Sequence, residues 1–241
     1  MGKRLSDFRV LSFDCYGTLV DWETGLRAGL GPLAARAGLA PDADAVLETF
    51  ARHEAAQQRE TPALRYSALL AAVYRRVAAE WGVPATPAEA EAFGASVGDW
   101  PAFPDTPGAL AYLKRHFKLV ILSNVDRASF ARTNARLRVA FDAILTAEDI
   151  GSYKPDPRNF ARLLAEVAGM GGREELLHVA ESLYHDHAPA QAAGIATAWI
   201  HRRHAQGGFG ATRAPEDMPA YDFRFLSLGE LAEAHRREAP P

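Results

Sequence analysis

The stretch Val10–Trp22, VLSFDCYGTLVDW, decides how the rest of the chain is interpreted. An apolar run of strand length ends at Asp14, and a Gly-Thr turn follows before the chain becomes apolar again. Because such runs are typical of strands covered on both faces, we predict a buried strand over residues 9–14. Backbone N–H groups of the glycine turn favour an ionised carboxylate and fix its direction. Asp14 is therefore a candidate nucleophile, general base or metal ligand, and the alternative is a carboxylate that only caps a turn.

Beyond residue 98 the chain alternates between two kinds of segment. Apolar runs that predict strands cover 118–124, 141–147, 175–182 and 196–200. Amphipathic segments that predict helices cover 106–116, 126–137, 156–169 and 185–194. Strands that are apolar on both faces and separated by helices indicate an α/β fold, with a parallel sheet covered by helices on both faces.

The segment between these two regions carries only helical patterns. Leu70, Val73 and Val77 lie on one face of a predicted helix, and no strand pattern occurs there. Prolines and glycines cluster over 98–108 and mark the return of the chain. We therefore predict a core made of residues 1–20 and 98–241, with an inserted all-helical domain over 21–97.

Polar residues follow three of the predicted strands. They are Asp14, the pair Ser123 and Asn124, and the pair Glu181 and Ser182. In open parallel sheets, ligands bind at the carboxyl ends of the strands, so we expect these residues to form one active site.

Further candidates lie in two turns. Lys154 stands in GSYKPDP, where two prolines restrict the backbone, and its ammonium near Asp14 would keep that carboxylate ionised. The turn between Glu181 and Asp186 can direct both carboxylates to one point.

Cys15 has no histidine near it in the sequence, so we interpret it as a residue that lines the pocket rather than as a nucleophile. A serine hydrolase is disfavoured because Ser123, which lies in the segment LSN, has no glycine beside it.

Composition limits the partners. The net charge of −3 does not favour nucleic acid, and the single cysteine allows no internal disulfide. No apolar run approaches the length of a membrane span, and the first residues lack the apolar core of a signal peptide. We expect a cytoplasmic protein that binds neither nucleic acid nor membrane.

Four segments in order resemble the motifs of the haloacid dehalogenase superfamily. They are FDCYGTLVD, LSN, YKPD and ESLYHD. The resemblance implies a Rossmann-like core with an inserted helical cap. It also implies that Asp14 is the nucleophile, that Thr18 supports it, and that Ser123 and Lys154 hold anionic groups.

The first motif is similar to that of the type II 2-haloacid dehalogenases. The phosphatases of the superfamily carry D-x-D there, and their second aspartate protonates the leaving group, whereas this chain has Tyr16. The resemblance implies that Asp14 attacks C2 of a small carboxylic acid and forms an ester, which water hydrolyses without a metal or other cofactor. It further implies a pocket lined by Cys15, Tyr16, Asn124, Ser182 and a cap arginine, for which Arg52 is the nearest match. A homodimer is one assembly that these relatives adopt.

The fourth motif departs from these dehalogenases. Glu181 stands where they carry a serine, Leu183 where they carry an asparagine, and Phe160 replaces a tyrosine. A second carboxylate in the pocket would repel a departing halide by about 4 kcal/mol at about 4 Å and an effective dielectric constant near 20. It would favour an ammonium instead, so the leaving group is expected to be an amine.

Four longer segments resemble the azetidine-2-carboxylate hydrolases. They are WPAFPDT, ESLYHDH, AWIHRRH and DFRF. The expected reaction is therefore ring opening of L-azetidine-2-carboxylate, a small imino acid, with Glu181 paired to the ring nitrogen and Asp186 activating water. One alternative is an (S)-2-haloacid dehalogenase. Others are a phosphatase in which Asp14 and Glu181 hold Mg²⁺, and a binding protein without catalytic activity on the same scaffold.

Overall fold

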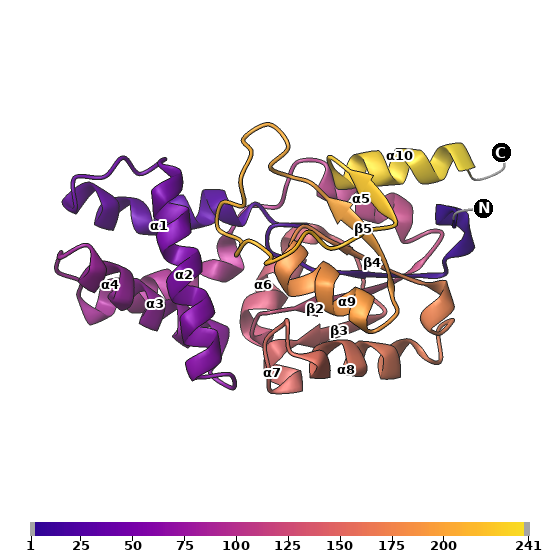
Figure 1. The fold of residues 1–241 in the computed structure, drawn as a ribbon, viewed down its shortest axis with the longest axis horizontal. Helices are drawn as coiled ribbons and strands as arrows, with labels where there is room; N and C mark the ends of the chain where they lie inside the picture. Colours follow the sequence, from indigo (N-terminus) through magenta and orange to yellow (C-terminus); the bar gives the residue numbers. More distant parts are fainter. Residues whose placement is uncertain (1–2, 239–241) are drawn as a thin grey trace.

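A computed structural model describes residues 3–238, and it shows a helical unit beside a layered α/β core (Figure 1). The core contains one six-stranded sheet in the order β3-β2-β1-β4-β5-β6, in which all neighbouring strands run parallel. The strands are β1 Val10–Phe13, β2 Lys118–Ser123, β3 Ala143–Thr146, β4 Leu176–Ala180, β5 Ala196–Ile200 and β6 Phe223–Phe225. The predicted α/β fold with a parallel sheet is confirmed.

Helices cover both faces of the sheet, and successive residues of β1 show why. Val10 packs with Phe160 of α8 and Ala190 of α9, whereas Leu11 and Phe13 belong to the cluster on the opposite face. The core helices are α5 Thr106–Leu113, α6 Arg127–Leu137, α7 Ala147–Ile150, α8 Pro157–Val167, α9 Ala188–Ala192 and α10 Leu228–Glu238. Because both faces are buried, the strands carry apolar residues almost without interruption.

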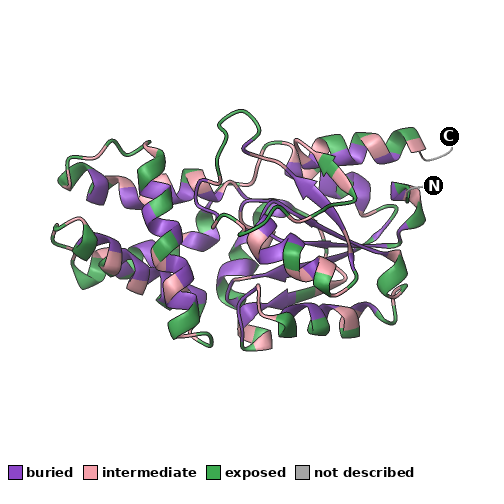
Figure 2. Cartoon of the chain, in the orientation of Figure 1, coloured by how far each residue is buried: buried purple, intermediate pink, exposed green. Residues whose placement is uncertain are grey.

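The inserted unit contains only helices within its described residues. They are α1 Trp22–Arg36, α2 Asp44–Glu60, α3 Tyr66–Glu80 and α4 Pro87–Ser96. Figure 2 shows that their buried surfaces face one another, while their outer surfaces are exposed. The two connections to the core run side by side, because the Asp21 N–H donates to Pro101 O at 2.8 Å and the Phe103 N–H donates to Leu19 O at 3.1 Å. We refer to α1–α4 as the cap.

The strand order places a topological switch point between β1 and β4. β2 lies on one side of β1 and β4 on the other, so the connections leave the carboxyl ends of these two strands in opposite directions. Such a point leaves a crevice in which ligands bind. Asp14 directly follows β1, and Glu181 directly follows β4.

The structure differs from the sequence-based expectation at four elements. Strand β6 and helices α7 and α10 were not predicted. Strand β6 has only three residues, which is too short for a reliable alternation pattern. The single helix predicted over 185–194 is instead a π-helical turn, Leu183–His187, followed by the short α9. A π-turn adds one residue per hydrogen-bonded loop, and it changes the direction of the side chains that follow β4.

Candidate active site

A tight turn after β1 holds Asp14 and Thr18 together. Gly17 has a φ of +95°, which side chains rarely adopt, and the backbone N–H groups of Thr18, Leu19 and Val20 all donate to Cys15 O. This geometry directs Thr18 Oγ1 to Asp14 Oδ2, which it reaches at 2.8 Å.

The Lys154 ammonium lies between two carboxylates. Nζ donates to Asp14 Oδ1 at 2.9 Å, to Asp186 Oδ1 at 2.6 Å and to Leu122 O at 2.9 Å. Asn124 fixes the lysine backbone from both sides, because its Oδ1 accepts from Lys154 N–H at 2.7 Å and its Nδ2 donates to Lys154 O at 3.1 Å. Asp14, Lys154, Asn124 and Asp186 are therefore brought together as the sequence predicted.

Burial and charge determine the ionisation of this group. Burial lowers the pKa of an amine, but the two carboxylates outweigh it and raise the pKa of Lys154. Burial and the Asp186 charge raise the pKa of Asp14, against the opposing effect of Lys154. Burial also opposes ionisation of Asp186, yet Lys154 and His178 together hold its pKa well below the ordinary value. Lys154 is the shared counter-ion that allows both carboxylates to ionise.

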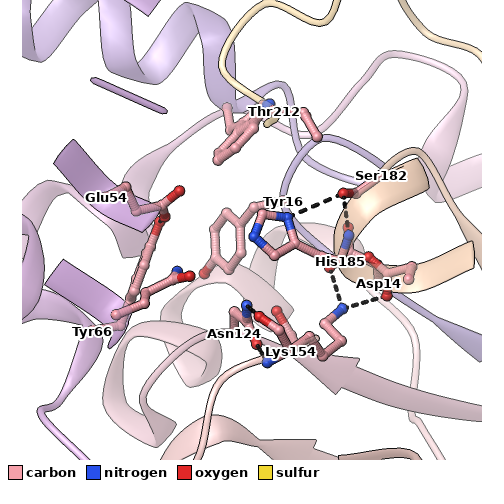
Figure 3. Close-up of a pocket in the computed structure, with 13 residues that line it drawn as sticks. Asp14, Tyr16, Glu54, Tyr66, Asn124, Lys154, Ser182, His185 and Thr212 are labelled. Carbon is pink, nitrogen blue, oxygen red and sulfur yellow. Dashed lines mark hydrogen bonds and ion pairs between the residues drawn. The ribbon is translucent and has the colours of Figure 1, made fainter. Parts of the chain in front are cut away.

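A small cavity of about 40 Å³ opens between the core and the cap (Figure 3). On the scale of one water per 10–15 Å³ of such space, it holds roughly three water-sized groups. The residues that line it are Asp14, Tyr16, Trp22, Glu54, Gln58, Tyr66, Ser123, Asn124, Lys154, Ser182, His185, Asp186 and Thr212. The cavity thus combines the ends of β1, β2 and β4 with helices α2 and α3 of the cap.

Tyr16 stands in place of the phosphatase acid, and its hydroxyl is engaged elsewhere. It forms a hydrogen bond with Thr133 Oγ1 at 2.8 Å, and its ring packs edge-on against Trp100. Burial raises the pKa of Tyr16 well above its ordinary value, so the phenol stays neutral. It contributes a neutral aromatic wall rather than a general acid.

Glu54 is a cavity residue that the sequence-based reasoning missed. It lies on α2, is 4% exposed and accepts a hydrogen bond from Tyr66 OH at 2.6 Å. In Figure 3, Glu54 and Tyr66 lie on one side of the cavity and Asp14 and Lys154 on the other. Burial raises the pKa of Glu54 to about 7. Its spacing from Phe50 was the available signal, since it places a carboxyl group on the apolar face of the helix.

Two groups face the cavity with unused hydrogen-bonding capacity. Ser123 Oγ and His185 Nε2 are buried and have no partner among the described residues. Ser182 Oγ holds the other ring nitrogen of His185 at 3.1 Å. Burial lowers the pKa of His185 to about 4, so this imidazole is neutral near pH 7. Lys154 is therefore the one cationic group that lines this cavity within residues 3–238.

Glu181 does not line this cavity, contrary to our prediction. Its side chain turns toward Thr212, whose hydroxyl donates to Oε2 at 2.9 Å, and burial raises its pKa to about 8. Only its backbone N–H serves the site, by donating to Thr18 Oγ1 at 2.9 Å. The physical reason is the turn after β4, which directs Ser182, His185 and Asp186 toward Lys154 and turns the Glu181 side chain away.

Two other predicted pocket residues also lie elsewhere. Arg52 is on the outer part of α2, where its guanidinium pairs with Glu80 at 2.8 Å and borders a larger surface groove. Cys15 is fully buried beneath the turn and does not border the cavity. The alternation of side chains along the extended backbone directs Cys15 away from the side of Asp14.

The donor set for the magnesium alternative is not assembled. That alternative required Asp14 and Glu181 to share an ion, yet Glu181 points to Thr212 and the Lys154 ammonium bridges Asp14 to Asp186. These residues therefore do not fit a Mg²⁺ site.

Comparison with known proteins places these features in context. A sequence model of the haloacid dehalogenase-like hydrolases matches residues 8–194. An (S)-2-haloacid dehalogenase of Pseudomonas sp. (strain YL) is 37% identical over 103 residues, which are 42% of this chain and 43% of that protein. A haloacid dehalogenase-like hydrolase domain-containing protein 3 of Mus musculus is 37% identical over 83 residues, or 34% of this chain and 32% of that protein. The chain matches less than half the length of these curated relatives.

Among solved structures, the chain is similar to an L-2-haloacid dehalogenase of Xanthobacter autotrophicus that carries covalently bound chloropropionic acid. The TM-score is 0.76 at 21% identity, over 96% of this chain and all of the other. This similarity supports the fold of both core and cap.

Within residues 3–238, no helix is both long and apolar enough to cross a bilayer.

Proposed function

This chain belongs to the haloacid dehalogenase-like hydrolases, and on that premise we propose that Asp14 displaces the C2 substituent of a small carboxylic acid through an aspartyl ester. The observation that carries the proposal is the environment of Asp14. Its carboxylate is held by Lys154 and Thr18 at 2.9 and 2.8 Å and lines the cavity between the core and the cap. Tyr16, in place of a phosphatase acid, argues for attack on carbon rather than phosphorus. Ser123 Oγ, which has no hydrogen-bond partner among the described residues, is available to hold the substrate carboxylate.

The cavity favours a leaving group that carries positive charge. Asp14, Asp186 and Glu54 contribute three carboxyl groups, against the single ammonium of Lys154. A halide released beside ionised Glu54 would meet repulsion of about 4 kcal/mol at about 4 Å and an effective dielectric constant near 20. The same carboxylate attracts a substrate ammonium. We assign to Glu54 the role in binding the ring nitrogen that the sequence had suggested for Glu181.

The substrate that combines these features is L-azetidine-2-carboxylate. Its carboxylate faces Ser123, and its ring ammonium faces Glu54. Asp14 attacks C2, the C2–N bond breaks, and its electron pair passes to nitrogen, which leaves as a primary amine still tethered to the same carbon chain. Water then adds to the Asp14 carbonyl carbon and releases the C2 oxygen as a hydroxyl. The proton set free by ester hydrolysis converts the amine to an ammonium, so the products are balanced.

A substrate panel with mass analysis tests this proposal. We expect loss of L-azetidine-2-carboxylate and no metal-dependent phosphate release from p-nitrophenyl phosphate. Rapidly quenched enzyme should carry an ester on Asp14 whose added mass equals one whole substrate, because the leaving amine stays attached. In ¹⁸O-water, a single turnover should label Asp14. Mg²⁺-dependent phosphatase turnover, or label that reaches only the product, would refute the proposal.

The second candidate is an (S)-2-haloacid dehalogenase, which the Pseudomonas and Xanthobacter relatives favour. The same panel separates it, because (S)-2-chloropropionate would release halide. The ester would then add to the enzyme the mass of the substrate minus the mass of one hydrogen halide.

A further inference from the structure

A second hydrogen-bonded chain runs behind the active site, through the buried layer of the sheet. Ser12 Oγ lies 2.8 Å from His178 Nδ1, and His178 Nε2 lies 2.8 Å from Asp186 Oδ1. All three side chains are at most 1% exposed, and neither Ser12 nor His178 lines the cavity. Adjacent strands bring them together, because Ser12 of β1 pairs with His178 of β4. The order resembles a catalytic triad, but the serine has no access to substrate.

This chain controls the orientation of Asp186. Oδ1 receives hydrogen bonds from both Lys154 and His178, whereas Oδ2 has no partner among the described residues. Ser12 O–H donation to Nδ1 leaves the proton on Nε2, which then donates to Asp186. Phe160 packs edge-on against the imidazole and restricts its rotation. A carboxylate held through one oxygen by two donors keeps its second oxygen free to accept a proton.

We propose that His178, fixed by Ser12, is a positioning residue for ester hydrolysis, because it holds Asp186 so that Oδ2 can take the proton of the attacking water. The inference rests on the proposed function. When the ester forms, Asp14 loses its charge, and Lys154 then pairs with Asp186 alone. His178 supplies the second anchor in that state.

The step is balanced within these groups. Water oxygen bonds to the Asp14 carbonyl carbon while one water proton passes to Asp186 Oδ2. The bond between that carbon and the substrate-linked oxygen then breaks, and the released alkoxide takes the proton back from Asp186. Asp186 is restored, and Asp14 regains its carboxyl group. His178 does not exchange a proton in this scheme.

His178→Phe and Ser12→Ala test the proposal in the full-length enzyme with L-azetidine-2-carboxylate. Pre-steady-state mixing with quenched intact-mass analysis measures ester formation and ester decay separately. We expect ester formation to change less than threefold in His178→Phe, while ester decay and kcat fall at least tenfold, which is part of the roughly 100- to 10,000-fold that a positioned proton acceptor contributes. The ester should therefore accumulate. Ser12→Ala should show a smaller accumulation, and His178→Gln, which keeps an N–H donor, should restore part of the decay rate.

His187→Gln is the matched control, since the Nε2–H of this buried histidine, which lies in the π-helical turn Leu183–His187, donates to Ala180 O at 3.0 Å rather than to Asp186. It should not accumulate ester. The positioning role would be overturned if His178→Phe slowed ester formation and ester decay equally. It would also be overturned if the rate of ester decay were unchanged in both single variants, Ser12→Ala and His178→Phe. If His178→Phe fails to fold, an unchanged rate of ester decay in Ser12→Ala is sufficient to overturn the positioning role. Absence of any ester in the wild-type enzyme would instead refute the proposed function.

Discussion

Two buried glutamates, Glu54 and Glu181, have side chains that point to different parts of the structure. Glu54 lines the cavity opposite Asp14, whereas Glu181 faces Thr212. Burial raises the pKa of both, to about 7 and about 8 respectively. Because the two environments are similar, the direction of each side chain is what distinguishes the roles of Glu54 and Glu181. Each glutamate is therefore the control for the other.

Replacing Glu54 by Gln should reduce kcat/KM for L-azetidine-2-carboxylate about 100-fold, equivalent to about 3 kcal/mol, because the buried ammonium loses its counter-ion. Glu181→Gln should change the same constant less than threefold. Steady-state kinetics with both variants check this. Equal losses in the two variants would contradict the assignment of the ring nitrogen to Glu54.

The pH profile offers an independent test at Tyr66. The Tyr66 hydroxyl stabilises ionised Glu54, and the substrate ammonium requires that ionised form, so kcat/KM should rise with pH up to about 7 and then level off. Tyr66→Phe removes the hydrogen bond and raises the pKa of Glu54 further. The acid limb should therefore move to higher pH. A limb that stays in place would assign it to another group, such as Asp14.

At the scale of elements, close contact between α3 and α4 maintains the cap that carries Glu54 and Tyr66. A Cβ added at Gly94 of α4 would lie 2.1 Å from the backbone oxygen of Ser67 in α3. The two helices can approach this closely only because Gly94 has no side chain.

Gly94→Ala should lower the free energy of unfolding by about 1–3 kcal/mol, since the backbone of α3 must move to accept the methyl group. Gly108→Ala is the matched control in helix α5, where the same Cβ meets nothing within 4 Å. That variant should be neutral or more stable by up to about 1 kcal/mol. Chemical denaturation measures both, and an unaffected Gly94→Ala would contradict the packing argument.

At the scale of the whole molecule, core and cap share one cavity. Neither part contains all its groups, since Asp14 and Lys154 belong to the core and Glu54 and Tyr66 to the cap. The paired connections at Leu19–Asp21 and Pro101–Phe103 link these two parts. Burial of ionisable groups at this junction makes stability depend on pH.

Glu181 should contribute a measurable part of that dependence. Its folded pKa of about 8 lies above the ordinary 4.5, so the folded state keeps a proton that the unfolded chain releases between these values. The free energy of unfolding should therefore fall as pH rises through that window, by about 1 kcal/mol per unit. Glu181→Gln cannot ionise. Its thermal unfolding midpoint should match that of the wild type near pH 4.5 and exceed it near pH 8.

Much of the fold was predicted from local patterns in the sequence. The run ending at Asp14 and the alternation beyond residue 98 predicted the parallel sheet, because strand periodicity and turn chemistry depend on neighbouring residues. The placement of Lys154 near Asp14 followed from motif order. Strand β6 was missed because three residues carry too little periodicity.

The sequence by itself determined the family, the α/β core with its helical insertion and the nucleophile candidate, because these depend on short motifs and their order. Only the tertiary structure decided which carboxyl groups face Asp14. The position of α2 in the cap placed Glu54 in the cavity, and the turn after β4 directed Asp186 into it and Glu181 out of it. Side-chain direction after a turn and contacts between distant segments depend on the packed backbone, which no local pattern specifies.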